Sequence, residues 1–155
     1  MPAITLDAIE AKQTELSKLI AQFKDQANQT TLRVLQEVEI TLKHGEHYAG
    51  PVLDADGNLL HHLVLTATCP DKLNWQAATD WATSIGGTLP TRQEQALLYA
   101  NCKPHLKPDW HWSSEAHEND ASYAWNCDFG YGHQNGSHKS YEGSVVAVRS
   151  IHVTA

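Results

Sequence analysis

Cysteine, methionine and phenylalanine are scarce in this chain. It has three cysteines, one methionine and two phenylalanines among 155 residues. The odd cysteine count leaves at least one thiol unpaired within the chain, which excludes a dense disulfide framework. A chain of this length buries roughly 68–70% of its unfolded surface, so it needs neither a metal nor a disulfide to fold.

Basic residues are outnumbered, with 11 Lys and Arg against 18 Asp and Glu and a formal net charge of −7. A general nucleic-acid binder would carry a basic patch or stripe, so we expect no nucleic-acid partner. The acidity promotes solubility and is compatible with a basic protein partner.

Long apolar runs are also missing. None approaches the ~20 residues that cross a bilayer, so we expect no membrane partner. Residues 1–7 lack the basic stretch and apolar run of a signal peptide. The sequence therefore predicts a protein made in the cytoplasm, and a final site in a virion or in a host cytoplasm stays open.

Residues 7–28 have the pattern of an amphipathic helix. Ile9, Leu16 and Phe23 recur every seven residues among Lys, Gln, Glu, Asp and Ser. An isolated helix of this length is marginally stable in water, so it must pack on something. Two partners stay open, namely its own domain or a second or third copy in a short coiled coil, a homodimer or homotrimer. Gln13 on the seam weakens the coiled coil.

We divide the chain into this N-terminal helix, residues 1–30, for oligomerisation or docking, and one domain, residues 31–155. After a break near residues 28–31 we expect a strand that ends at Leu42. Residues 48–53 and 61–65 then flank an Asp-Gly turn, which supplies the positive φ angles of a β-hairpin.

Two helices follow the hairpin. Asn74 is placed to cap a helix that runs to about Ile85 and ends at Gly86-Gly87. Thr91 and Glu94 form a capping box at the start of the next helix. The apolar face of the first helix consists of Trp75, Ala78, Trp81, Ala82 and Ile85.

The last third of the chain has strand-like segments at residues 110–115, 123–130 and 144–151, separated by loops rich in Gly, Asn, His, Ser and Tyr.

Three motifs carry a resemblance to a known family. They are Leu-Pro-Thr-Arg-Gln-Glu at residues 89–94, Trp-Ser-Ser at 112–114 and Val-Arg at 148–149. With the hairpin and the Trp-bearing helix before them, they make residues 45–151 similar to the Lcl C-terminal domains, a bacterial and prophage family. The resemblance implies an α+β fold, namely a C-type-lectin-like core with two helices and a small antiparallel sheet, preceded here by the N-terminal amphipathic helix. Some members of the family occur at the ends of adhesins or in phage-encoded proteins.

Large aromatic side chains dominate burial, so we expect four tryptophans in the core. They are Trp75, Trp81, Trp112 and Trp125. Arg149, on a late strand, is expected to pair with Glu94 or Glu115 rather than with a ligand.

The resemblance raises the question of calcium-dependent sugar binding, which uses a Trp-Asn-Asp strand and a proline-containing acidic loop. Trp125-Asn126-Cys127-Asp128 has a cysteine where the acid should stand, and Glu118-Asn119-Asp120 lacks the proline. These departures argue against a calcium site.

Zinc and thiol chemistry also lack a pattern. His105, His111 and His117 are spaced by six, which matches no usual zinc-ligand arrangement. Cys127 is expected to be a buried small hydrophobe, and Cys102 lacks the helix N-terminus that would favour a thiolate. We therefore expect no catalytic residues, no metal, no cofactor and no enzyme activity.

The loops at residues 119–123 and 130–143 have the composition of binding loops, and a loop beyond ~12 residues is uncommon without a role. The candidate contact residues are Asn119, Asp120, Tyr123, Tyr131, His133, Gln134, Asn135, His138 and Tyr141. The leading hypothesis is a non-enzymatic recognition module of phage or prophage origin that binds a host protein or a surface glycan. The alternatives are a phage-encoded inhibitor of a host defence or regulatory protein, and a thiol or metal-dependent enzyme.

Overall fold

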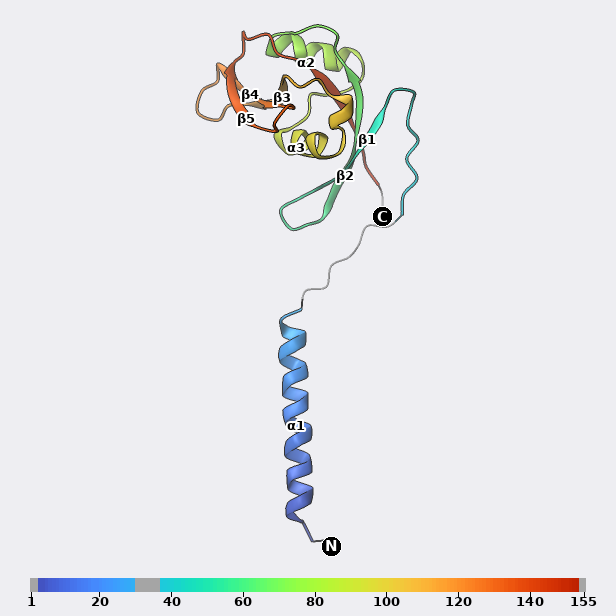
Figure 1. Cartoon of the computed structure of the whole chain (residues 1–155), viewed down its shortest axis with the longest axis vertical. Helices are drawn as coiled ribbons and strands as arrows, with labels where there is room; N and C mark the ends of the chain where they lie inside the picture. The colour runs from blue at the N-terminus through green and yellow to red at the C-terminus, as the bar shows by residue number, and fades with distance from the viewer. Residues whose placement is uncertain (1–2, 30–36, 154–155) are drawn as a thin grey trace. The chain divides into compact units, whose positions relative to one another are not determined.

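The computed structural model describes residues 3–29 and 37–153, which fall into two compact units divided between Val38 and Glu39 (Figure 1). The first unit contains helix α1 (Leu6–Ala27), whose 22 residues are all exposed. The Thr5 hydroxyl caps it by accepting a hydrogen bond from the Ala8 amide at 3.2 Å. Within the described residues, no helix has both the length and the apolar character that crossing a bilayer demands.

The second unit has the predicted α+β class, with α2 (Trp75–Ser84), α3 (Arg92–Asn101) and a short 3₁₀ helix η1 (Lys103–His105). Its described strands form two three-stranded antiparallel sheets, where the sequence predicted one. The first sheet has the order β1-β2-β6, with β1 (His47–Leu53), β2 (Leu59–Thr68) and β6 (Val146–Ile151). The second has the order β3-β4-β5, with β3 (Trp110–Ala116), β4 (Tyr123–Asp128) and β5 (Gln134–His138).

The segment before β6 connects the two sheets. The Ser144 amide donates to the Trp110 carbonyl at 2.9 Å, and the Ser144 carbonyl accepts from the Trp112 amide at 3.1 Å. One residue later, the Val145 carbonyl accepts from the Cys69 amide beyond the end of β2 at 2.9 Å. The chain therefore runs beside β3 and then joins β2, which fixes the second sheet against the first.

The hairpin of β1 and β2 is confirmed. The Asp54 carbonyl accepts from the Gly57 amide at 3.1 Å, and the Asp54 amide donates to the Asn58 carbonyl at 2.8 Å. Gly57 has a φ of +83°, while Asp56 keeps a negative φ, so the turn needs one left-handed residue rather than two. This geometry is that of a longer hairpin loop in which glycine takes the left-handed position.

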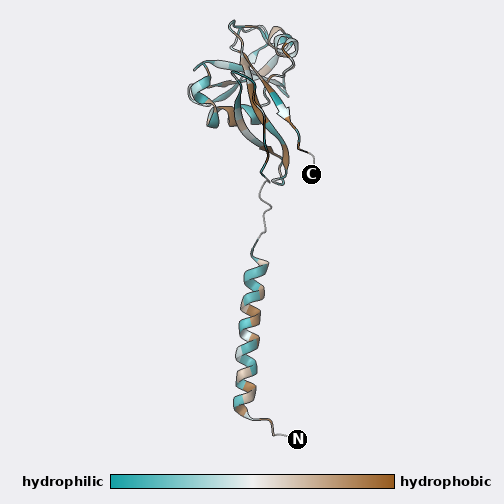
Figure 2. Cartoon of the chain, turned by 90° about the vertical axis from the view of Figure 1, so that its right-hand side faces the viewer, coloured by the Kyte–Doolittle hydropathy of each residue, from teal (hydrophilic) through white to brown (hydrophobic). Residues whose placement is uncertain are grey.

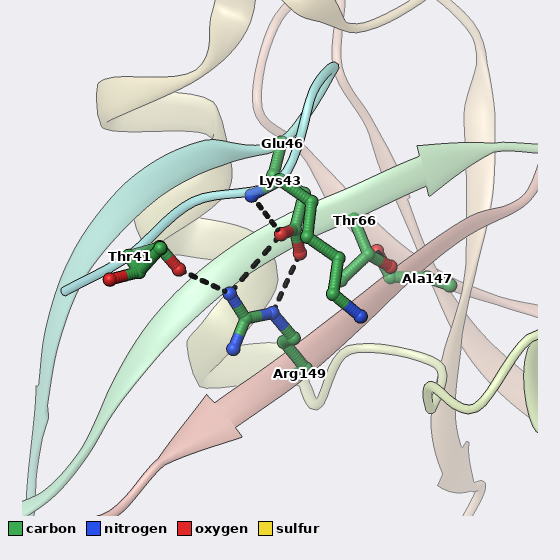
Figure 3. Close-up of polar contacts among 6 residues, drawn as sticks. All are labelled: Thr41, Lys43, Glu46, Thr66, Ala147 and Arg149. Carbon is green, nitrogen blue, oxygen red and sulfur yellow. Dashed lines mark hydrogen bonds and ion pairs between the residues drawn. The ribbon is translucent and has the colours of Figure 1, made fainter.

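The predicted strand ending at Leu42 is wrong for residues 37–43, which form no strand, and residues 30–36 lie outside the described part of the chain. A side chain holds this segment instead (Figure 3). Arg149 donates from Nη2 to the Thr41 carbonyl at 3.1 Å and from Nε to the Glu46 carboxylate at 2.6 Å. The expected pairing of Arg149 with Glu94 or Glu115 is also wrong, since Glu46 is its partner.

Both predicted helix caps are confirmed. Asn74 Oδ1 accepts from the Ala77 amide at 2.9 Å. The Thr91 hydroxyl accepts from the Glu94 amide at 3.1 Å, and Glu94 accepts from the Thr91 amide at 2.9 Å. Ile85 was expected on the apolar face of α2, but it is 47% exposed because the helix ends at Ser84.

The tryptophan prediction holds for Trp112, which is fully buried, and is wrong in part for Trp75, Trp81 and Trp125, which are half-buried. Trp75 and Trp81 pack at the margin of a core formed by α2, Trp112 and the start of β6. A second core lies between the first sheet and α3, where Leu63, Leu98 and Val148 are fully buried.

Candidate functional site

Strand β4 is the centre of the second sheet, and alternate residues of a strand face opposite sides. Ala124 and Asn126 are buried, whereas Tyr123 is 37% exposed and Trp125 is half-buried. Tyr123 and Trp125 therefore belong to the outer face. The prediction that Trp125 is a core residue is wrong in part, because its ring lies on the same face of β4 as the exposed Tyr123.

The His117 ring stacks on Trp125, with ring centres 4.8 Å apart and an angle of 17° between the planes. His117 directly follows β3, and its amide donates to the Tyr123 carbonyl at 2.8 Å. The turn between β3 and β4 is thus closed by the backbone of His117. This closure places the imidazole over the indole of the neighbouring strand.

Two charged side chains hold the Trp125 ring in position. The guanidinium carbon of Arg92, at the start of α3, lies 3.6 Å from the ring centre, a cation–π contact. The indole N–H donates to the Glu118 carboxylate at 2.9 Å. That hydrogen bond is the main reason that the pKa of Glu118 lies below its ordinary value of 4.5.

Gly136 makes room for the ring stack. It lies opposite Trp125 in the β4–β5 pairing. A Cβ atom at this position would stand 3.1 Å from Cδ2 of His117, closer than ordinary van der Waals contact. The glycine in β5 therefore lets the His117 ring lie close to the strand backbone.

These rings border an open pocket of about 320 Å³. Its lining consists of His117, Asp120, Tyr123, Trp125, Asn135 and Gly136. The pocket combines three ring systems with one carboxylate and one amide. Apolar or aromatic walls with a few polar groups are the usual composition of a binding pocket.

Asp120 is an anionic group at the rim of this pocket. Its carboxylate accepts from the Ser122 hydroxyl at 2.6 Å and from the Ser122 amide at 2.9 Å. These hydrogen bonds, the hydroxyl one first, hold the pKa of Asp120 below its ordinary value of 3.8. At neutral pH the Asp120 carboxylate is therefore an ionised hydrogen-bond acceptor in the pocket, and its hydrogen bonds to Ser122 also stabilise the turn that carries it.

Five of the nine predicted contact residues gather at this end of the second sheet. Asp120, Tyr123 and Asn135 line the pocket. The His138 ring contacts Tyr123 edge-on, with ring centres 5.5 Å apart. The backbone N–H of Asn119 donates to Nδ1 of His117 at 3.2 Å.

The other four predicted residues lie elsewhere. Tyr131 is 78% exposed and stacks on His133 at the opposite end of β5, with ring centres 6.2 Å apart. The Gln134 amide is engaged by Arg92 twice, accepting from Nε at 3.0 Å and donating to the Arg92 carbonyl at 2.8 Å. Tyr141 contacts Trp112 edge-on at 6.1 Å.

The expectation that residues 130–143 form a loop is wrong for residues 134–138, since β5 lies there and pairs with β4 from Tyr123 to Cys127. Its sequence, Gln-Asn-Gly-Ser-His, has no β-branched or large apolar residue. The pairing therefore comes from backbone hydrogen bonds to β4 and not from side-chain preference.

Three residues of the site were not among the predicted contacts, namely His117, Trp125 and Gly136. Strand parity with Tyr123 was the available signal for Trp125. Gly136 in the middle of a polar segment was a signal for close backbone approach. No local pattern in the sequence indicated the ring stack of His117.

The three cysteines are buried and unpaired. The expectation that Cys127 is a buried small residue is confirmed, and burial raises the pKa of its thiol to about 11. Burial also raises the pKa of the Cys102 thiol. In the part of the chain that the structure describes, no group of three or more His, Cys, Asp or Glu side chains could hold a metal ion.

No protein-family model matches this chain, and the comparison with curated proteins finds no similar one.

Proposed function

We propose that this chain is a non-enzymatic recognition module that binds a surface glycan through the pocket between the β3–β4 turn and β5. The observation that carries the proposal is the stacked pair of His117 and Trp125, bordered by Tyr123 and the ionised Asp120. Since His117 and Arg92 lie over the Trp125 ring, the ring most exposed to a ligand is that of Tyr123, and Asp120 supplies a strong hydrogen-bond acceptor on the same open pocket.

A sugar fits this combination because its ring has apolar C–H faces and a polar edge of hydroxyl groups. The C–H groups on the faces of a sugar ring carry slight positive charge and pack on the electron-rich face of an aromatic ring. The hydroxyls at its edge can donate to the Asp120 carboxylate, and hydrogen bonds to a charged acceptor are stronger than neutral ones. An open pocket of about 320 Å³ suits one residue or one branch of a larger glycan.

The chemistry of the acidic and thiol groups supports a binding role over a catalytic one. General acid–base catalysis is most efficient when the pKa lies near the working pH. The pKa values of Glu118 and Asp120 are instead shifted down, so both stay ionised. The raised pKa values of Cys102 and Cys127 likewise disfavour the reactive thiolate.

We also propose that residues 45–151 belong to the Lcl C-terminal-like group with a C-type-lectin-like fold and derive from a phage or prophage. Contacts among the three resembling motifs support this. The Ser114 amide donates to the Pro90 carbonyl at 2.8 Å, and Thr88, directly before the first motif, exchanges backbone hydrogen bonds of 3.0 and 2.9 Å with Val148. The motifs thus form one connected structural unit around the start of α3 and β6.

Glycan-array screening of the full chain, followed by isothermal titration with the best ligand, tests the binding proposal. Tyr123→Ala and Asp120→Asn should each weaken binding at least tenfold, because they remove a pocket wall and the anionic acceptor. Tyr131→Ala, a more exposed tyrosine at the far end of β5, is the matched control and should bind like the parent protein.

Thermal melting of all variants checks that the fold is intact. Failure of the parent chain to bind any glycan, or equal affinity of Tyr123→Ala and Tyr131→Ala, would reject the pocket as a glycan site. Capture of one stoichiometric host protein without glycan binding would point to the inhibitor alternative.

A further inference from the structure

Helix α1 carries an apolar stripe that is exposed among the described residues of its own unit. Figure 2 shows hydrophobic positions recurring along an otherwise hydrophilic helix. The large apolar side chains of the stripe are between 47% and 70% exposed. They are Leu6, Ile9, Leu16, Leu19, Ile20 and Phe23.

The centre of the stripe consists of two interleaved seven-residue series, and Leu19 lies beside them. One series is Leu6, Gln13, Ile20 and Ala27, and the other is Ile9, Leu16 and Phe23. They alternate by three and four residues, which is the spacing of the a and d positions of a coiled coil. A stripe of this width fits one facing helix with the same spacing, so a second copy of α1 is the occupant that it matches best.

We propose that α1 pairs with α1 of a second chain in an antiparallel two-stranded coiled coil centred on Lys18. In this register Leu16 packs against the partner's Ile20 at the middle of the interface. Gln13 lies opposite the partner's Phe23, so the amide faces a ring whose edge and face both accommodate polar groups. Ile9 packs against the partner's Ala27, which puts a large residue beside a small one.

Charge decides the direction of the two helices. Glu10 and Lys24 occupy equivalent positions beside the seam, one at each end of α1. Antiparallel pairing brings Glu10 next to the partner's Lys24, and the twofold symmetry makes this pair twice. Parallel pairing would instead put Glu10 beside the partner's Thr5 and Lys24 beside the partner's Leu19, with no ion pair.

The opposite flank of the seam agrees with this direction. Leu19 lies there, and antiparallel pairing sets it against the partner's Leu19 on the twofold axis. Lys12 then lies near the partner's Gln26, where neither charge nor size conflicts. Both flanks of the antiparallel seam are therefore closed by compatible groups.

Analytical ultracentrifugation of the full chain over a wide concentration range tests the pairing. The parent protein should sediment at twice its 17.2 kDa mass. Glu10→Lys and Lys24→Glu should each dissociate at least tenfold more readily, because each variant sets like charges against each other at both ends. Lys18→Glu, on the outward side of α1, is the matched control and should dimerise like the parent.

Mixing the two charge variants gives the decisive comparison. A Glu10→Lys chain with a Lys24→Glu chain restores two opposite-charge pairs in an antiparallel heterodimer, so the mixture should regain parental affinity. A monomeric parent protein, as expected if α1 docks on residues 39–155 of its own chain, would overturn the proposal. A trimer, or a dimer that the charge variants and their mixture leave unchanged, would overturn it as well.

Discussion

Replacing Arg149 by methionine should destabilise the second unit by about 2 kcal/mol at neutral pH. The Glu46 side chain is only 5% exposed, and Arg149 donates to both of its oxygens, at 2.6 and 3.2 Å (Figure 3). Breaking a buried ion pair costs about 3–5 kcal/mol, because one charge is left without a partner. We expect less here because Arg149 is 29% exposed and the Lys43 amide still donates to Glu46 at 2.6 Å.

The pH dependence of this loss tests its electrostatic origin. The Arg149 hydrogen bond is the main reason that the pKa of Glu46 is below 4.5. A lowered carboxyl pKa stabilises the fold above the ordinary value, and the stabilisation is lost as the pH falls through the folded-state value. Arg149→Met removes the main cause of the lowered Glu46 pKa, so the difference between the two proteins should shrink as the pH falls below about 4.5.

Urea denaturation followed by tryptophan fluorescence measures this difference, since all five tryptophans lie in the second unit. Lys72→Met is the control, because Lys72 and Asp109 form an exposed pair at 3.8 Å. It should cost less than about 0.5 kcal/mol. An Arg149→Met loss as small as that of the control, or one that is constant from pH 7 to pH 3, would refute the reasoning.

Two further predictions concern a buried histidine and the glycine turns. Burial lowers the pKa of His111 from 6.5 to about 4, so the unfolding free energy should fall by roughly 3 kcal/mol between these pH values as only the unfolded chain binds the proton. His111→Asn should remove this one-proton slope in urea titrations, and an unchanged slope would assign the proton to another group. Gly57→Ala should lower the unfolding free energy by about 1 kcal/mol, because Gly57 has a positive φ. Gly132→Ala should lower it further, because Gly132 also has a positive φ and a Cβ there would lie 2.8 Å from Tyr99, whereas a Cβ at Gly57 meets nothing within 4 Å. Equal melting temperatures of the two glycine variants would contradict this.

Elements with local signals were predictable from the sequence. The Thr91–Glu94 capping box and the Asn74 cap each need only residues three positions apart. The Gly57 turn is also local, since its hydrogen bonds join residues within the same five-residue loop. In each case the atoms that satisfy the backbone are supplied by near neighbours in the chain, so the pattern is readable without the fold.

The partner of Arg149 and the strand β5 depend on distant residues, and no local pattern contains them. Glu46 lies 103 positions before Arg149 in the chain. Glu94, the predicted partner, is instead held by His61, which contacts its carboxylate at 2.7 Å. Strand β5 is polar, and only its pairing with β4 makes it a strand.

The candidate site was predictable only where its residues carry a local signal in the sequence. Asp120 and Tyr123 were found because turn and aromatic residues stand out in a loop. Trp125 was assigned to the core because its size suggested burial, whereas the parity it shares with Tyr123 places it on the outer face. For an aromatic residue on a strand, the face to which it points is thus more informative than its hydrophobicity.

The pocket owes its form to a residue that cannot itself bind a ligand. Gly136 offers no side chain, yet any Cβ there would press on His117, and His117 is the group that extends the aromatic surface of Trp125. Arg92 then fixes Trp125 through its guanidinium, and Gln134, two residues before Gly136, fixes Arg92 in turn. Strand β5 therefore contributes the space at Gly136 and the Gln134 amide that holds Arg92. The rings that would meet a sugar come from β4 and the β3–β4 turn.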